Sequence, residues 1–277
     1  MQDAFAHCAE LVRNADRDRF LATLFAPAEH RDALHALYAF NLEIGRVRQA
    51  AREPMPGEIR LQWWREVVSG ERSGEAGANP VAAALLDAIA RYRLPASTLT
   101  DVIEAHRFDL YDEPMATVAD LENYARRTSA AVIDLAAQIL GVQAPAVAEP
   151  AGVALAIAGL LRALPLHAAR RQLYVPIELL QRHAVTAEAV FACQSSDGLN
   201  AALAEVQDLA WQHLAAARHA LPTLPPQALS AVLPVALVRP SLNRLQRSDA
   251  FAPGEVPSWR RQWLIWRAAR NPARIAA

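Results

Sequence analysis

The sequence predicts an all-α protein, and three observations support this fold class. The chain has 277 residues, 53% of them hydrophobic and only 10 of them glycine, so it can bury a large core and favours helix. Apolar residues recur with helical spacing in many segments, as at Leu34, Leu37 and Tyr38. No segment alternates with the period of two that marks a half-buried strand. We therefore expect one all-α domain over residues 1–277.

Helical periodicity predicts the individual helices in chain order. They are expected at residues 31–47, 59–68, 81–92, 96–108, 118–139, 152–164, 177–183, 198–220 and 227–238. Stretches rich in proline or glycine predict breaks at residues 54–57, 69–80, 112–114, 142–150, 222–226 and 252–257. Ser97 precedes an apolar periodic run and is expected to cap its helix.

Composition excludes several classes of function. The net charge of −1 argues against a nucleic-acid partner, and all 28 basic residues are arginine, which excludes a P-loop lysine or a pyridoxal phosphate Schiff base. Cys8 and Cys193 have no CxxC partner, so a disulfide or zinc scaffold is not expected. The first 20 residues lack the apolar run of a signal peptide, and the longest apolar stretch, residues 151–161, is too short to span a membrane. We expect a cytoplasmic protein, either free or peripheral to the inner membrane.

The titratable residues suggest no strong metal site. Asp109 and Glu113 are four residues apart, a spacing at which one helix face can offer two carboxylates to Mg²⁺. They run into Pro114, and we favour the interpretation that they lie at a solvated helix end, which leaves them as weak metal candidates.

Residues 258–272, SWRRQWLIWRAARNP, predict a helix with tryptophan and arginine at helical spacing. Trp259, Trp263 and Trp266 lie at i, i+4 and i+7. Such a helix could make peripheral contact with a membrane interface. Core packing of the three rings is the commoner outcome for such a stripe, and we expect that here.

Several stretches, taken together and in order, resemble the squalene/phytoene synthase family. They are LYAFNLEIGRVRQ (residues 37–49), GEIRLQWWREVV (57–68), the stretch 99–141 around Tyr124, and LAIAGLLRALPLHAARRQLYVPIELL (155–180). The resemblance is strongest over residues 10–185. It implies the isoprenoid-synthase helical bundle with a central pocket.

The resemblance also implies which residues face that pocket. The family couples two prenyl diphosphates with Mg²⁺ held by two aspartate motifs on facing helices. This chain has Gly45 and Gln49 at the aspartate positions of the first motif, and Ala163 and His167 at those of the second. Without carboxylates the motifs offer Mg²⁺ no hard anionic ligand, so we expect no metal cofactor and no catalytic residue. By resemblance, the expected pocket residues are Tyr38, Arg46, Tyr124, Arg162, Arg171 and Tyr174.

The detailed pattern resembles the branch of non-catalytic complex I assembly factors. This implies an assembly or chaperone role with a respiratory complex subunit as the partner. Two alternatives remain open. The first is a prenyl diphosphate transferase that uses Mg²⁺ and joins farnesyl or geranylgeranyl diphosphate, and the second is a carrier that binds an isoprenoid or another lipid.

Overall fold

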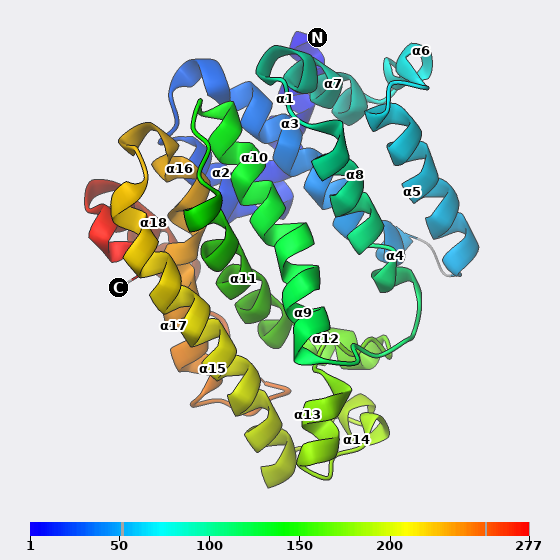
Figure 1. Cartoon of the computed structure of the whole chain (residues 1–277), viewed down its shortest axis with the longest axis vertical. Coiled ribbons are helices and arrows are strands. Elements are labelled where there is room, and N and C mark those ends of the chain that lie inside the picture. Colours follow the sequence, from blue (N-terminus) through cyan, green and yellow to red (C-terminus); the bar gives the residue numbers. More distant parts are fainter. Residues whose placement is uncertain (51–52, 253, 277) are drawn as a thin grey trace.

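The computed structural model describes residues 1–50, 53–252 and 254–276, and every regular element in these residues is a helix. The helices form one elongated bundle with its long axis vertical in Figure 1. The predicted all-α fold class is confirmed.

The first half of the chain forms one side of the bundle and part of its centre. Its elements are α1 (Gln2–Ala15), α2 (Arg17–Thr23), α3 (Ala28–Gly45), α4 (Val47–Ala50), α5 (Pro54–Val68), α6 (Ser73–Ala76), α7 (Pro80–Tyr92), α8 (Ala96–Ala105), η1 (Phe108–Leu110), α9 (Val118–Ala125), η2 (Arg126–Ala130) and α10 (Ala131–Ile139). The second half comprises α11 (Pro145–Arg162), α12 (Leu164–Ala169), α13 (Ile177–Arg182), α14 (Ala187–Phe191), α15 (Asp197–Ala220), η3 (Leu221–Thr223), η4 (Pro226–Ala228), α16 (Leu229–Val232), η5 (Leu233–Leu237), α17 (Val238–Leu245), α18 (Ser258–Arg270) and η6 (Pro272–Arg274).

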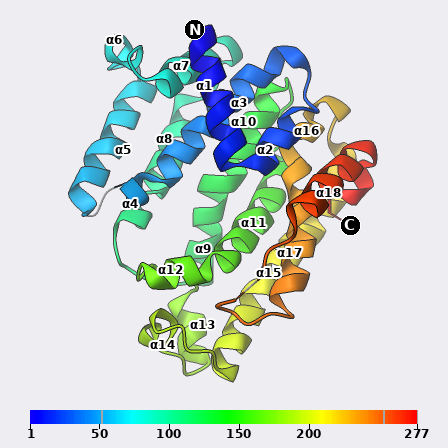
Figure 2. The same cartoon turned by 180° about the vertical axis from the view of Figure 1, so that it is seen from behind.

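The N-terminal helices pack through small and apolar side chains. The α1 helix buries Ala4, Cys8 and Val12, which recur every four residues and therefore lie on one face. That face contacts α3 and α7. Viewed from behind, α1 crosses in front of α3, as Figure 2 shows. The short helices α12, α13 and α14 gather at the opposite end of the bundle, beside the start of α15.

The α11 helix lies in the middle of the bundle and organises the core. It packs against α15, η2, α10 and α17. Among the described residues it is the one helix that could cross a membrane by length and apolar composition, and 50% of it is buried inside the protein. The apolar segment predicted from the sequence is shorter than this helix, because the prolines predict a break at residues 142–150. That break is wrong over residues 145–150, because the helix starts at Pro145 and continues through Pro150, and it is correct for residues 142–144, which lie outside any helix.

Proline near helix starts explains most of the differences from the predicted elements. Pro54 and Pro56 lie in the first turn of α5, where the missing N–H would be unpaired anyway, so the break predicted at residues 54–57 is also wrong. Pro95 rather than Ser97 occupies the cap position of α8. The helix predicted at 227–238 is instead divided into η4, α16 and η5. Residue 253 of the break predicted at 252–257 lies outside the described residues.

The helix predicted at residues 118–139 is confirmed as a continuous run with one irregular turn. It consists of α9, the π-helical turn η2 and α10. The hydroxyl of Thr128 in this turn donates to the Tyr124 carbonyl at 2.7 Å. A π-helical turn widens the helix locally and re-aims the side chains around it.

The three tryptophans of α18 are exposed, so the expectation that they pack in the core is wrong. Trp259 is 70% exposed, Trp263 45% and Trp266 48%. The buried residues of α18 are Ile265 and Ala268, which lie on another face of the helix. This smaller face meets η5 and α2 and leaves the tryptophan stripe in solvent.

Gly152 provides a test of the α11–η2 contact. A Cβ at Gly152 would overlap the Ala130 backbone and lie 2.7 Å from Ala130 Cβ, whereas a Cβ at Gly159 of the same helix would meet no atom within 4 Å. Gly152→Ala should therefore destabilise the protein by about 1–3 kcal/mol through overpacking. Gly159→Ala should instead be neutral or stabilising by up to ~1 kcal/mol, because alanine favours helix. Urea unfolding of both variants measures this, and equal stabilities would contradict the proposed close contact.

Candidate functional site

A cavity of about 320 Å³ opens between α2, α3, α9 with η2, α11, η5, α17 and α18. One part of its wall is apolar and includes Leu155, Leu160 and Leu237. The remaining wall is polar, and its side chains are those of Asp16, Asp18, Arg19, Asn41, His106, Tyr124, Thr128, Ser129, Arg162, Ser241 and Arg261. A cavity in which polar groups converge beside an apolar wall can hold a small molecule and fix its orientation.

Gly45 lies in the cavity wall, but its motif partner does not. The α3 helix ends at Gly45, and Gln49 belongs to the separate helix α4, where it is exposed. A Cβ at Gly45 would meet only His106 Cε1, at 3.8 Å. Arg46 caps α3 and is exposed outside the lining residues. The first motif therefore presents a glycine to the cavity.

The second motif is divided by a helix end. The α11 helix ends at Arg162, and α12 restarts at Leu164 with Pro165 in its first turn. Ala163 is the residue between the two helices. His167 lies on α12 and packs against the Tyr174 ring with the centroids 4.6 Å apart. Burial lowers the pKa of His167 to about 4, so its imidazole is neutral near pH 7.

Arg162 is the cation that the cavity leaves unpaired. Among the residues that the structure describes, no hydrogen bond or ion pair involves its guanidinium. Solvent reaches the side chain through the cavity, while the surrounding protein and the neighbouring Arg261 lower its pKa. Arginine remains protonated at neutral pH despite such a shift. Its five N–H donors are therefore available to an anion.

The two carboxylates of the cavity are already matched by arginines. Asp16 forms an ion pair with the Arg19 guanidinium at 3.4 Å, and Asp18 is paired with Arg261 of α18. Arg19 also lies over the ring of buried Tyr38, 5.2 Å from its centroid. Burial raises the pKa of Tyr38 to about 12. Sequence reasoning missed all four charged residues as cavity residues, and the Asp18–Arg261 pair has no local signal because its members are 243 positions apart.

Asp109 is buried in a tyrosine cluster rather than at a solvated helix end, so that expectation is wrong. It is 7% exposed. Tyr174 donates to its carboxylate at 2.6 Å, Tyr124 at 3.0 Å, and His106 Nδ1 lies 2.7 Å from it. Burial, and then the charge of Asp109, raise the pKa of both tyrosines. Both hydroxyls therefore act as donors that hold the carboxylate in place.

Glu113 and Arg171 lie away from the cavity. Glu113 is exposed in the irregular segment that follows η1, apart from the buried Asp109. Arg171 is exposed, pairs with Glu188 at 2.5 Å and covers the Phe191 ring. Of the residues predicted to face the pocket, Tyr124 and Arg162 belong to the lining. Tyr38 and Tyr174 are buried and do not belong to the lining.

This donor set does not fit a divalent cation. Mg²⁺ prefers carboxylate oxygens in octahedral geometry. The cavity offers it a glycine at position 45, and the carboxylates of Asp16 and Asp18 are held by arginines. Within the described part of the chain, no group of three or more His, Cys, Asp or Glu side chains is arranged to hold a metal ion.

Comparison with solved structures shows the fold. A dehydrosqualene synthase superposes with a TM-score of 0.82 at 17% identity, covering 97% of this chain and 96% of that one. A squalene synthase from Alicyclobacillus acidocaldarius superposes with a TM-score of 0.69 at 23% identity, covering 97% and 95%. The chain therefore has the helical fold of isoprenoid synthases, as the sequence resemblance implies.

Comparison of sequences places the chain in its family. It is 30% identical to the human NADH dehydrogenase (ubiquinone) complex I, assembly factor 6, over 88% of this chain and 74% of that protein. It is 23% identical to the 15-cis-phytoene synthase of Synechococcus elongatus over 65% of this chain and 63% of that protein. The model of the squalene/phytoene synthase family matches residues 12–267. The chain belongs to the squalene/phytoene synthase family.

Proposed function

We propose that this protein is a non-catalytic assembly factor for a respiratory membrane complex, complex I. The observation that carries the proposal is the similarity over 88% of the chain to a complex I assembly factor. The identity to the phytoene synthase is lower and covers less of the chain. A respiratory complex subunit is then the partner.

The geometry of the cavity supports the same proposal. Ionisation of a prenyl diphosphate requires stabilisation of charge on the leaving group, which metal ions supply in two-carboxylate sites. Here α3 presents Gly45, and α11 ends before His167. Four of the charged residues that line the cavity form the ion pairs Asp16–Arg19 and Asp18–Arg261. Arg162 is the charged lining residue that remains available to a ligand.

Deletion of the gene in its native host tests the assembly role. NADH:quinone oxidoreductase activity of the membranes should fall, and partly assembled complex I should accumulate. Succinate dehydrogenase activity of the same membranes is the control and should be unchanged. Normal complex I activity in the deletion strain would contradict the proposal.

The absence of metal-dependent synthesis is tested separately with the pure protein. Because Mg²⁺ finds no carboxylate pair in the cavity, its addition should leave the melting temperature unchanged, whereas a ligand at 100 times its Kd stabilises by about 2.7 kcal/mol. Incubation with farnesyl or geranylgeranyl diphosphate and Mg²⁺ should give no squalene or phytoene. Formation of either product would favour the transferase alternative.

One observation favours a second candidate function, binding of an isoprenoid or another lipid with an anionic head. The cavity combines an apolar wall at Leu155, Leu160 and Leu237 with the unpaired Arg162. An anionic head on Arg162 would place an attached hydrocarbon chain against that wall. Such binding is compatible with the assembly role and needs no turnover.

Arg162→Gln tests this candidate. Farnesyl diphosphate serves as the probe. The variant should bind it about tenfold or more weakly than the original protein, because it loses hydrogen bonds to a charged group that contribute ~1.5–3 kcal/mol. Arg46→Gln is the matched control, because Arg46 is exposed outside the cavity lining. Calorimetric titration gives both values. Equal losses in the two variants would indicate nonspecific attraction and contradict a site at Arg162.

A further inference from the structure

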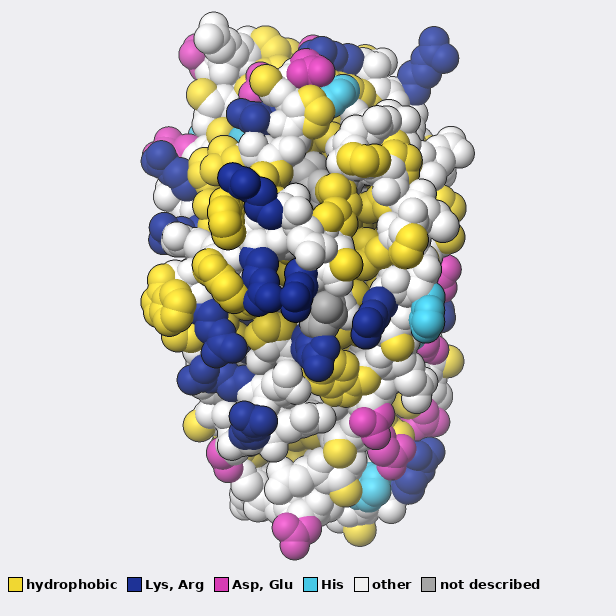
Figure 3. Space-filling model, turned by 90° about the vertical axis from the view of Figure 1, so that its left-hand side faces the viewer, with side chains coloured by type: hydrophobic (Ala, Val, Ile, Leu, Met, Phe, Trp, Pro, Cys, Tyr) yellow, Lys and Arg dark blue, Asp and Glu magenta, His cyan; other side chains and the backbone are white. Residues whose placement is uncertain are grey.

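The C-terminal helices concentrate positive charge in a nearly neutral protein. Residues 238–276 contain eight arginines and two carboxylates, Asp249 and Glu255, whereas the whole chain has a net charge of −1. Figure 3 shows the arginines gathered in the middle of one face of the molecule, with hydrophobic side chains around them. The α17 and α18 helices form this face.

A pocket between α17 and α18 collects six of these arginines. Its volume is about 550 Å³. We call it the arginine pocket, and its guanidinium groups are those of Arg239, Arg244, Arg247, Arg260, Arg267 and Arg274. No aspartate or glutamate of the described residues belongs to its lining. The pocket therefore has a strongly positive wall without an internal counter-charge.

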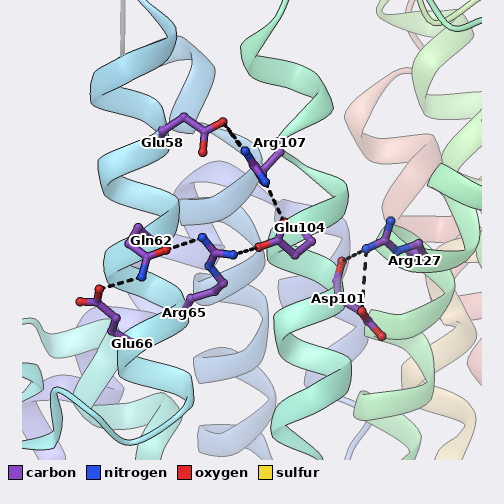
Figure 4. Close-up of polar contacts among 8 residues, drawn as sticks. All are labelled: Glu58, Gln62, Arg65, Glu66, Asp101, Glu104, Arg107 and Arg127. Atoms are coloured by element: carbon purple, nitrogen blue, oxygen red, sulfur yellow. Dashed lines mark hydrogen bonds and ion pairs between the residues drawn. The ribbon is translucent and has the colours of Figure 1, made fainter.

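The arginines of this pocket differ from most others in the protein. Figure 4 shows the usual situation, in which Arg65 pairs with Glu104, Arg107 with Glu58, and Arg127 with Asp101. In the part of the chain that the structure describes, no guanidinium of the arginine pocket forms an ion pair or hydrogen bond. Six like charges held together repel one another, so an anion would stabilise the arrangement.

The tryptophan stripe lies beside the pocket on the same helix. Trp259, Trp263 and Trp266 project from one side of α18, opposite the region of buried Ile265 and Ala268. Arg267 of the pocket lies over the Trp263 ring, 4.9 Å from its centroid, and Arg270 lies over the Trp266 ring at 5.1 Å. Tryptophan and arginine together favour the boundary between lipid headgroups and acyl chains, where the ring is half wet and the cation meets phosphate.

We propose that the face formed by α17 and α18 docks on an anionic phospholipid bilayer, with a lipid phosphate in the arginine pocket and the three tryptophans in the interface. The guanidinium groups of the arginine pocket are complementary in charge and geometry to phosphate oxygens, which favours a partner that carries phosphate. The exposed stripe of large rings selects a bilayer rather than a soluble anion, because only the bilayer buries them. The proposal rests on charge and exposure alone and is independent of the assembly role.

Vesicle flotation with the full chain tests this docking surface. The protein should float with vesicles that contain phosphatidylglycerol and not with vesicles of phosphatidylcholine alone. Binding should weaken as salt is raised, because screening shortens the reach of the arginines. Soluble glycerol phosphate should compete poorly, since it cannot bury the tryptophans. Flotation that does not depend on anionic lipid would overturn the proposal.

Two variants and a matched control locate the contact. A triple change of Arg239, Arg244 and Arg260 to Gln should weaken partitioning about a hundredfold, at roughly fivefold per arginine near an anionic surface. A triple change of Trp259, Trp263 and Trp266 to Ser should also weaken it. The control changes Arg60, Arg127 and Arg182 to Gln, which removes the same charge from exposed arginines that are paired with carboxylates elsewhere. The control should bind like the original protein, and equal losses in the control and the pocket variant would refute the proposed site.

A second measurement on the unaltered protein keeps the test valid if a variant fails to fold. Lipids brominated near the headgroup should quench tryptophan fluorescence in phosphatidylglycerol vesicles, and unquenched emission would refute insertion. Single-stranded DNA provides the competing outcome, because aromatic rings and arginines also bind nucleic acid. Binding of DNA that is lost in both triple variants, without binding to vesicles, would assign the face to nucleic acid instead.

Discussion

The contact between α11 and the π-helical turn η2 determines where the cavity lies. Gly152 of α11 lies directly against the Ala130 backbone, and this close approach leaves no room for a side chain. The same helix then runs past Thr128 and Ser129 and ends at Arg162 in the cavity wall. Because α11 also packs on α9, α17 and η5, which supply other lining residues, its position fixes several of the walls together.

The charges in the cavity wall differ from those of a cation-binding site, because its carboxylates already have cationic partners. The half-buried carboxylates in its wall, Asp16 and Asp18, are paired with arginines, and the buried carboxylate of Asp109 is held by two tyrosine hydroxyls and a histidine. The two ion pairs are half-buried, so each carboxylate in the wall already has a cationic partner. Among the described charged residues that line the cavity, Arg162 is the one without an ion-pair partner, so the wall carries an unmatched positive charge.

Local patterns made much of the fold predictable from sequence, and long-range pairing made part of the site unpredictable. The helix over residues 118–139 was predictable because its apolar period continues through the π-helical turn. Gly45 and Arg162 could be found because the family resemblance aligns them. The Asp18–Arg261 pair could not, since nothing local to either residue indicates the other. The motif spacing did not indicate that His167 lies on a separate helix, because the helix end at Arg162 depends on packing and on Pro165.

The spacing of the α18 tryptophans defines a stripe, but spacing alone cannot determine which way the stripe faces. Two faces of α18 were available to the core. The smaller face, with Ile265 and Ala268, fits against η5 and α2, and Arg261 adds its pair with Asp18 on that side. Once this face is buried, helix geometry leaves the tryptophans, Arg260 and Arg267 on the outside. The α18 helix thus contributes Arg261 to the cavity wall, and Arg260 and Arg267 to the arginine pocket. A partner bound at the arginine pocket would therefore contact a helix that also forms part of the cavity wall.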